Sequence, residues 1–189
     1  MIAAVVVSVI AAILILAAMK SDDLHVERSL VMKASPRQIF PLINELRAWE
    51  AWTPYDRDPG MRETYSGPAG GPGARYAWTG NREAGEGSIT ITQSLPYSQV
   101  ALDLDMIKPF QGHNKVVFRL MPDIDGTRVT WELDDKTPYV GKVAGLFVDL
   151  DRKIGSDFEE GLARLKRVAE RTGRTHTEAS VPYRLECVE

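Results

Sequence analysis

The pattern of apolar and polar positions along the chain predicts seven β-strands, because apolar residues recur at every second position in seven short stretches. The clearest alternations are Val116 with Phe118 and Leu120, and Val129 with Trp131. Turns rich in glycine or containing Asp-Gly separate the later stretches, which is typical of an antiparallel meander with one buried and one solvated face. We predict the strands at residues 24–33, 61–66, 74–80, 87–95, 99–108, 113–122 and 127–136.

Two short helices are predicted between the first and second strands. Ser35 can serve as an N-cap, Pro36 suits the first helical position, and Gln38 stands where a capping box places its glutamine. The apolar side of this first helix is formed by Ile39, Leu42, Ile43 and Leu46. A second short helix or turn follows and carries Trp49 and Trp52.

The last part of the chain predicts one long amphipathic helix. From Pro138 onward the apolar positions return to the period of 3.6 residues that marks a helix, and the pattern ends near Thr172-Gly173, where glycine can form the C-cap. The apolar stripe contains Phe147, Leu150, Ile154, Phe158, Leu162 and Leu165. Gly155 and Gly161 weaken this helix, but the missing side chains would let it approach a sheet closely.

The N-terminal segment predicts a membrane anchor at residues 1–20. Residues 2–19 are apolar apart from Ser8, and about 18 residues in a helix just cross a hydrocarbon layer of roughly 30 Å. A cleaved signal peptide is one competing interpretation, although no basic residue precedes the run and Ala17-Ala18-Met19 is a poor cleavage site. A buried core helix is the other competing interpretation.

The basic residues after this segment favour a single-pass membrane protein whose body is cytoplasmic. Lys20, Arg28 and Lys33 follow the apolar run and nothing basic precedes it, and cytoplasmic flanks carry the excess of Lys and Arg. An exported body is the alternative. The part beyond the anchor divides into one predicted domain at residues 24–171 and a flexible tail at residues 172–189.

Composition and charge exclude several classes of partner and cofactor. The net charge is -3 and the basic residues are scattered, so we expect no nucleic-acid binding. Cys187 is the only cysteine, which excludes an internal disulfide and a cysteine-based zinc site. The three histidines show no metal-ligand spacing and the glycines form no nucleotide fingerprint, so neither a metal site nor a cofactor is expected. The oligomeric state stays open.

The order of strand, two helices, six strands and long helix resembles the SRPBCC superfamily, which includes the START lipid-transfer domains and the polyketide cyclase/dehydrase group. The resemblance covers residues 24 to about 171. Its most telling stretches are Ala34-Ser35-Pro36, Trp49-Glu50-Ala51-Trp52-Thr53-Pro54, Tyr76-Ala77-Trp78-Thr79-Gly80-Asn81, Gly126-Thr127-Arg128-Val129-Thr130-Trp131 and Phe158-Glu159-Glu160-Gly161-Leu162. It implies an α+β helix-grip fold, a seven-stranded curved antiparallel sheet wrapped on the long C-terminal helix, and a hydrophobic cavity between the two.

The residues expected to line that cavity are aromatic or aliphatic and lie on the predicted buried faces. They are Trp49, Trp52, Tyr76, Trp78, Ile89, Ile91, Leu102, Leu104, Phe118, Trp131, Phe147, Leu150 and Ile154. Only two polar residues are weak catalytic candidates. Glu86 could be a buried acid or base, or instead a solvated hairpin carboxylate or an ion-pair partner of Arg82, and His113 stands at a hairpin without a visible acidic partner.

Three functions remain open on the sequence. The first is a non-catalytic carrier or sensor of a hydrophobic small molecule or lipid, tethered to a membrane by its N-terminal segment. The second is a polyketide cyclase/dehydrase-like enzyme, which needs polar groups inside the cavity. The third is an interaction module with a vestigial cavity. Residues 138–150 are more apolar than one buried stripe requires, and they form either a portal facing the membrane or a helix wrapped by the sheet.

Overall fold

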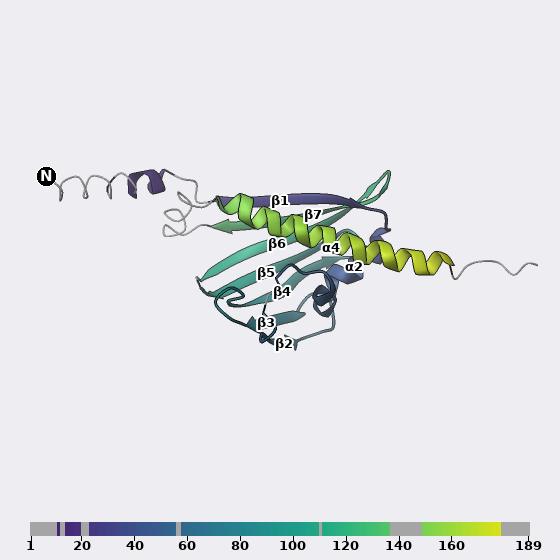
Figure 1. Ribbon diagram of the computed structural model, residues 1–189, viewed down its shortest axis with the longest axis horizontal. Coiled ribbons are helices and arrows are strands. Elements are labelled where there is room, and N and C mark those ends of the chain that lie inside the picture. Colours follow the sequence, from purple (N-terminus) through teal and green to yellow (C-terminus); the bar gives the residue numbers. More distant parts are fainter. Residues whose placement is uncertain are drawn as a thin grey trace, which may run out of the picture.

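The fold is a seven-stranded antiparallel sheet with one long helix packed across it, as Figure 1 shows. The computed structural model describes residues 11, 14–19, 23–55, 58–109, 111–136 and 149–178. The strands are β1 (Asp23–Met32), β2 (Arg62–Ser66), β3 (Arg75–Thr79), β4 (Glu86–Leu95), β5 (Gln99–Lys108), β6 (Gly112–Asp123) and β7 (Gly126–Lys136). The helices that follow β1 are α2 (Pro36–Asn44), the 3-10 helix η1 (Leu46–Ala51) and α4 (Leu150–Glu178).

The strand order across the sheet is β1-β7-β6-β5-β4-β3-β2. The strands β2 to β7 form a meander, and β1 joins it by pairing antiparallel with β7. The observed strand bounds lie within one residue of the predicted ones, because the alternation and the turn residues mark strand ends well in a meander. The helix-grip fold and the two short helices between the first two strands are therefore confirmed.

The core lies between the sheet and the helices. Helix α4 packs mainly against β1 and also contacts β7, and we call the sheet face that it covers the inner face. Along β6, Val116, Phe118 and Leu120 are buried on the inner face, whereas Arg119 between them is exposed. Helix α2 adds Ile39, Phe40 and Ile43 to the same core, and its first turn is closed as predicted, with Gln38 accepting from the backbone N–H of Ser35 at 2.8 Å.

The bounds of the long helix differ from the prediction at its C-terminal end and are set by a cap at its N-terminal end. The helix continues to Glu178, past the predicted end at Thr172-Gly173, because a glycine inside a helix costs only about 1 kcal/mol relative to alanine and need not end it.

At the N-terminal end of α4, the Asp149 carboxylate accepts from the backbone N–H of Arg152 at 3.1 Å. A side-chain acceptor at this place is the usual N-cap, so α4 begins at Leu150. The predicted helical segment before it, residues 138–148, lies outside the described residues, as does the tail from residue 179.

Gly155 and Gly161 of α4 allow the close approach that the sequence predicts. A Cβ atom added at Gly161 would lie 2.7 Å from Cζ3 of Trp131 and 3.1 Å from Cδ of Pro54. A Cβ atom at Gly155 would meet the guanidinium group of Arg28. Side chains of β7 and β1 therefore cross the helix at Gly161 and Gly155, where it has no side chain of its own.

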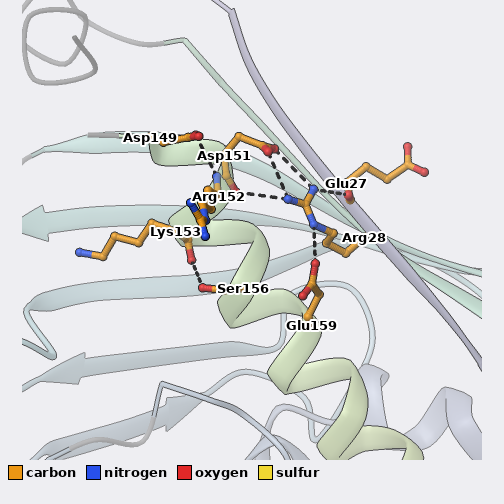
Figure 2. Close-up of polar contacts among 8 residues, drawn as sticks. All are labelled: Glu27, Arg28, Asp149, Asp151, Arg152, Lys153, Ser156 and Glu159. Carbon is orange, nitrogen blue, oxygen red and sulfur yellow. Dashed lines mark hydrogen bonds and ion pairs between the residues drawn. The ribbon is translucent and has the colours of Figure 1, made fainter. Parts of the chain in front are cut away.

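Arg28 holds the first turns of α4 on β1 through ion pairs, which Figure 2 shows. Its Nε donates to Glu159 at 3.0 Å and its Nη2 donates to Asp151 at 3.1 Å. Its Nη1 donates to the backbone carbonyl of Glu27 at 2.8 Å. The Arg28 side chain is three-quarters buried, with 25% of its surface exposed, so its charge is neutralised where the helix covers it.

The predicted membrane anchor falls mostly outside the described residues, which include only 11 and 14–19 of the first twenty. Within the described part of the chain, no helix has both the length and the apolar character needed to cross a membrane.

Candidate functional site

The residues predicted to line a cavity fall into two groups on the inner face. Trp49, Trp52, Phe118 and Trp131 lie with Phe158 in one cluster that we call the aromatic core. The second group is only half-buried and lies on the part of the same face that is away from α4. It consists of Tyr76, Trp78 and Leu104, and we call it the open apolar row. Of the other predicted residues, Ile89, Ile91 and Leu102 are buried and Ile154 is half-buried. Phe147 lies outside the described residues, and the side chain of Leu150 is not described.

The aromatic core is closely packed. The rings of Trp131 and Phe158 stack with centroids 4.1 Å apart, and Trp52 meets Phe118 edge to face with centroids 6.0 Å apart. Trp52 and Phe118 are fully buried. These rings fill the space between α4, η1 and the middle of the sheet with one another, in the stacked and edge-to-face geometries that aromatic side chains prefer.

The open apolar row lies on β3 and β5, on either side of β4, in the part of the sheet away from α4. Tyr76 pairs with Ile89, which in turn pairs with Leu104, so these three side chains are neighbours on the inner face. Trp78 stacks on Tyr76 with centroids 5.6 Å apart and planes 18° apart. The row stays half-buried because α4 packs on β1 and β7, at the opposite edge of the sheet from β2 and β3.

A glycine seats Trp78 on the sheet. Gly87 of β4 pairs with Trp78, and a Cβ atom added there would lie 2.8 Å from Cζ2 and Cη2 of its indole ring. The benzene ring of the indole therefore lies against the glycine, and its Nε1 donates to the carbonyl of Ala84 at 3.0 Å. This arrangement fixes the orientation of an apolar surface that remains partly open.

Tyrosine hydroxyls and one carboxylate form the polar end of the open apolar row. Tyr76 donates to Glu63 at 2.9 Å, and Tyr65 donates to the other oxygen of Glu63 at 3.3 Å. Burial, followed by the nearby charge of Glu63, raises the pKa of Tyr65 to about 12. The phenol of Tyr65 therefore stays protonated at neutral pH and acts as a hydrogen-bond donor, not as a base. Sequence patterning missed Glu63, because an exposed glutamate in an edge strand carries no distinctive signal.

The two weak catalytic candidates form ion pairs at the end of the sheet. Glu86 pairs with Lys108 at 2.7 Å, and not with Arg82 as the sequence suggested. Nδ1 of His113 lies 2.6 Å from Asp105, an acidic partner on the neighbouring strand that the sequence spacing did not reveal. The hydrogen bond to Asp105 raises the pKa of His113. His113 is exposed, and strand alternation places it opposite the buried Asn114, so it points away from the inner face.

A small cavity of about 90 Å³ lies between η1 and the turn from β2 to β3. Its lining includes Arg47, Tyr65 and the loop from Gly67 to Ala69, and the Arg47 guanidinium carbon lies 4.3 Å from the centre of the Tyr65 ring. Ligand pockets for drug-sized molecules measure about 300–1,000 Å³, so this cavity is too small for a lipid. No group of three or more His, Cys, Asp or Glu residues that could hold a metal ion occurs among the described residues.

Comparison with protein families gives one match over most of the chain. The model of the family described as polyketide cyclase / dehydrase and lipid transport matches residues 23–170. A search of curated proteins found no match.

Solved structures with the same fold are numerous but distant in sequence. A protein from Mesorhizobium loti is 14% identical, with a TM-score of 0.59 over 79% of this chain and 98% of that one. A protein of unknown function from Staphylococcus aureus is 14% identical, with a TM-score of 0.58 over 80% of this chain and 96% of that one. The Aha1 dimer from Colwellia psychrerythraea is 19% identical, with a TM-score of 0.56 over 78% and 96%. At these identities the likeness shows the fold alone.

Proposed function

Because the chain belongs to the polyketide cyclase / dehydrase and lipid transport family of the SRPBCC superfamily, we propose that it binds a hydrophobic small molecule or lipid on the inner face of its sheet, without catalysis. The observation that carries this proposal is the open apolar row. Tyr76, Trp78 and Leu104 form an apolar surface that stays half-buried on the inner face and is connected through Ile89. Concave apolar surfaces with a few polar groups are the usual small-molecule sites.

The polar groups near the open apolar row are better suited to orienting a ligand than to acid or base catalysis. Glu63 is engaged by two tyrosine hydroxyls, and the phenol of Tyr65 is held neutral. Glu86 and His113 pair with neighbours at the sheet end. An acid or base of a cyclase-like enzyme must come within hydrogen-bond distance of the reacting atom. Because each of these polar groups is already bonded to a neighbour in the protein, the contacts favour binding over the enzymatic alternative.

The apolar segment at residues 1–20 supports a second part of the proposal, which is a tether to a membrane. Its length and composition fit a single span, and the basic residues after it favour a cytoplasmic body. A tether would keep the binding domain close to a bilayer, where a hydrophobic ligand is concentrated. This part of the proposal rests on the sequence.

Native mass spectrometry of the full chain, purified in mild conditions, tests the binding proposal. We expect a bound apolar molecule to accompany the protein, and extraction with organic solvent should recover it.

A second experiment measures binding of an added fatty-acid-like probe. Glu86→Gln and His113→Ala should leave that binding within about threefold, because neither residue supplies much apolar contact. A chain that carries no molecule and binds no such probe would contradict the proposal. Loss of a measurable turnover in these two variants, with binding retained, would favour the enzyme.

A further inference from the structure

A polar pair lies on the inner face of the sheet beside the open apolar row. Asn114 of β6 pairs with Leu104 of that row, and the pairing of Lys115 with Asp134 brings Asp135 to the other side of Asn114. Strand alternation places the side chains of Asn114 and Asp135 on the inner face. Only 8% of Asn114 is exposed. A buried amide therefore continues the line of side chains that runs through Leu104.

The carboxylate of Asp135 sets the orientation of the Asn114 amide. An ionised carboxylate only accepts hydrogen bonds, whereas an amide has a donor side and an acceptor side. The amide nitrogen of Asn114 therefore faces Asp135 and donates to its two oxygens at 3.0 and 3.1 Å. The amide oxygen points the other way. None of the hydrogen bonds among the described residues uses this oxygen, so it can accept from a further donor.

The amide oxygen faces the space above Gly112, which lies two residues before Asn114 on the same face of β6. Apart from chain neighbours, a Cβ added at Gly112 would have only this end of the amide, at 3.7 Å, within 4 Å among the described residues. Met106, which pairs with Gly112, is half-buried, as Leu104 is. The oxygen is also not sealed in, because among the described residues only Nε1 of Trp131 is both fully enclosed and without a partner.

We propose that the bound molecule is an apolar alcohol, whose hydroxyl donates to the amide oxygen of Asn114 while its apolar part lies on the open apolar row. This inference rests on the proposed function and specifies the class of ligand. Strand pairing leads from Tyr76 through Ile89 and Leu104 to Asn114, so the apolar part and the hydroxyl meet consecutive side chains across the sheet. A buried acceptor without a donor is unfavourable, and a hydroxyl supplies the donor that a hydrocarbon lacks.

The test compares two probes and matched variants of the full chain. The probes are dodecanol and its methyl ether, which share the oxygen and the apolar chain, although only the alcohol can donate a hydrogen bond. Asn114→Leu removes the acceptor and keeps a side chain of similar shape. Asn44→Leu is the control, because the oxygen of Asn44 already accepts from Ser94 at 2.6 Å.

We expect the natural protein to bind dodecanol about tenfold more tightly than the ether, the ratio of one good hydrogen bond. The ether is the more apolar molecule, so an apolar surface alone would favour the ether instead. The preference for the alcohol should vanish or reverse in Asn114→Leu and persist in Asn44→Leu. Gly112→Ala should also remove it, because the added methyl group occupies the space in front of the oxygen at an ordinary contact distance.

Dodecanol binding to the natural protein no more tightly than the ether would overturn the hydroxyl and leave the binding proposal intact. A preference for the alcohol that survives in folded Asn114→Leu would also overturn it, because another acceptor would then be responsible. If neither probe binds, the proposed function itself fails and the inference fails with it.

Circular dichroism shows whether each variant is folded before binding is compared. If Asn114→Leu does not fold, the side-chain carbonyl ¹³C signal of Asn114 in the natural protein decides. Dodecanol should shift this signal downfield and the ether should not, since only the alcohol donates to the amide oxygen. Equal shifts with both probes would overturn the inference.

Discussion

The ring of Trp131 on β7 stacks on the ring of Phe158 on α4, with centroids 4.1 Å apart and planes within 9° of parallel. Both residues are at least 97% buried, since 3% of Trp131 and 1% of Phe158 are exposed. The contact joins the last strand to the long helix at the point where Gly161 lets the two elements approach closely. It anchors one side of the inner face and leaves the open apolar row on the other side accessible.

Replacing Phe158 with alanine should reduce the free energy of unfolding by about 3–5 kcal/mol, the usual cost of removing a buried phenylalanine ring. Denaturant unfolding followed by circular dichroism measures this loss. Lys153→Ala on the exposed side of the same helix is the matched control and should stay within about 0.5 kcal/mol. A loss below about 1 kcal/mol for Phe158→Ala would mean that the stacked contact does not hold the helix.

Gly161→Ala should destabilise the protein although alanine favours helices. Alanine improves helix propensity by up to about 1 kcal/mol, but its Cβ would lie 2.7 Å from the buried ring of Trp131. Overpacking of this kind costs about 1–3 kcal/mol, so the net change should lower the melting temperature. Arg167→Ala, at an exposed position of the same helix, should change it little. A higher melting temperature for Gly161→Ala would show that the helix lies farther from the sheet.

Arg28→Met should reduce stability by about 1 kcal/mol or more, because it leaves Asp151 and Glu159 without their partner while keeping an apolar stem of similar length. A double-mutant cycle with Asp151→Asn should give a coupling energy of the favourable sign. Lys108→Met, which removes a pair with Glu86 in which the lysine side chain is 69% exposed, should cost less. Additive effects of Arg28→Met and Asp151→Asn would contradict the ion pair at the start of α4.

Two histidines should titrate above the ordinary value of 6.5. The hydrogen bond to Asp134 raises the pKa of His25, and the hydrogen bond to Asp105 raises that of His113. A raised pKa in the folded state adds stability that is fully present below about pH 6.5 and is lost as the pH rises through the folded-state pKa. Proton NMR titration measures both midpoints, and Asp134→Asn or Asp105→Asn should lower that of its own histidine only. Midpoints at or below 6.5 in the natural protein would exclude these contacts in solution.

The sheet could be predicted from the sequence almost residue by residue, because a meander leaves its signature in short-range alternation and turns. Val116, Phe118 and Leu120 illustrate this, since each lies on the predicted buried face. The end of α4 was predicted too early because Gly173 permits a helix to end but does not require it. The local sequence pattern does not show whether a helix stops at a glycine that allows it to stop.

The candidate site was less predictable, because its features depend on distances across the sheet. The pairs of Glu86 with Lys108 and of His113 with Asp105 join neighbouring strands, and strand register does not follow from the composition of one strand. Similarly, Trp78 and Trp131 both stand on alternating apolar faces, yet one is half-buried and the other fully packed. Their difference comes from where α4 crosses the sheet.

The central claim is that the open apolar row binds an apolar ligand, and titration of a fluorescent fatty-acid-like probe into matched variants tests it most directly. Leu104→Gln places a polar group on the half-buried inner face, whereas Ile107→Gln places it at a position that is 48% exposed on the same strand. We predict that Leu104→Gln weakens probe binding tenfold or more, which corresponds to about 1.4 kcal/mol, and that Ile107→Gln leaves it within about twofold. Equal affinities of both folded variants and the natural protein would contradict the claim.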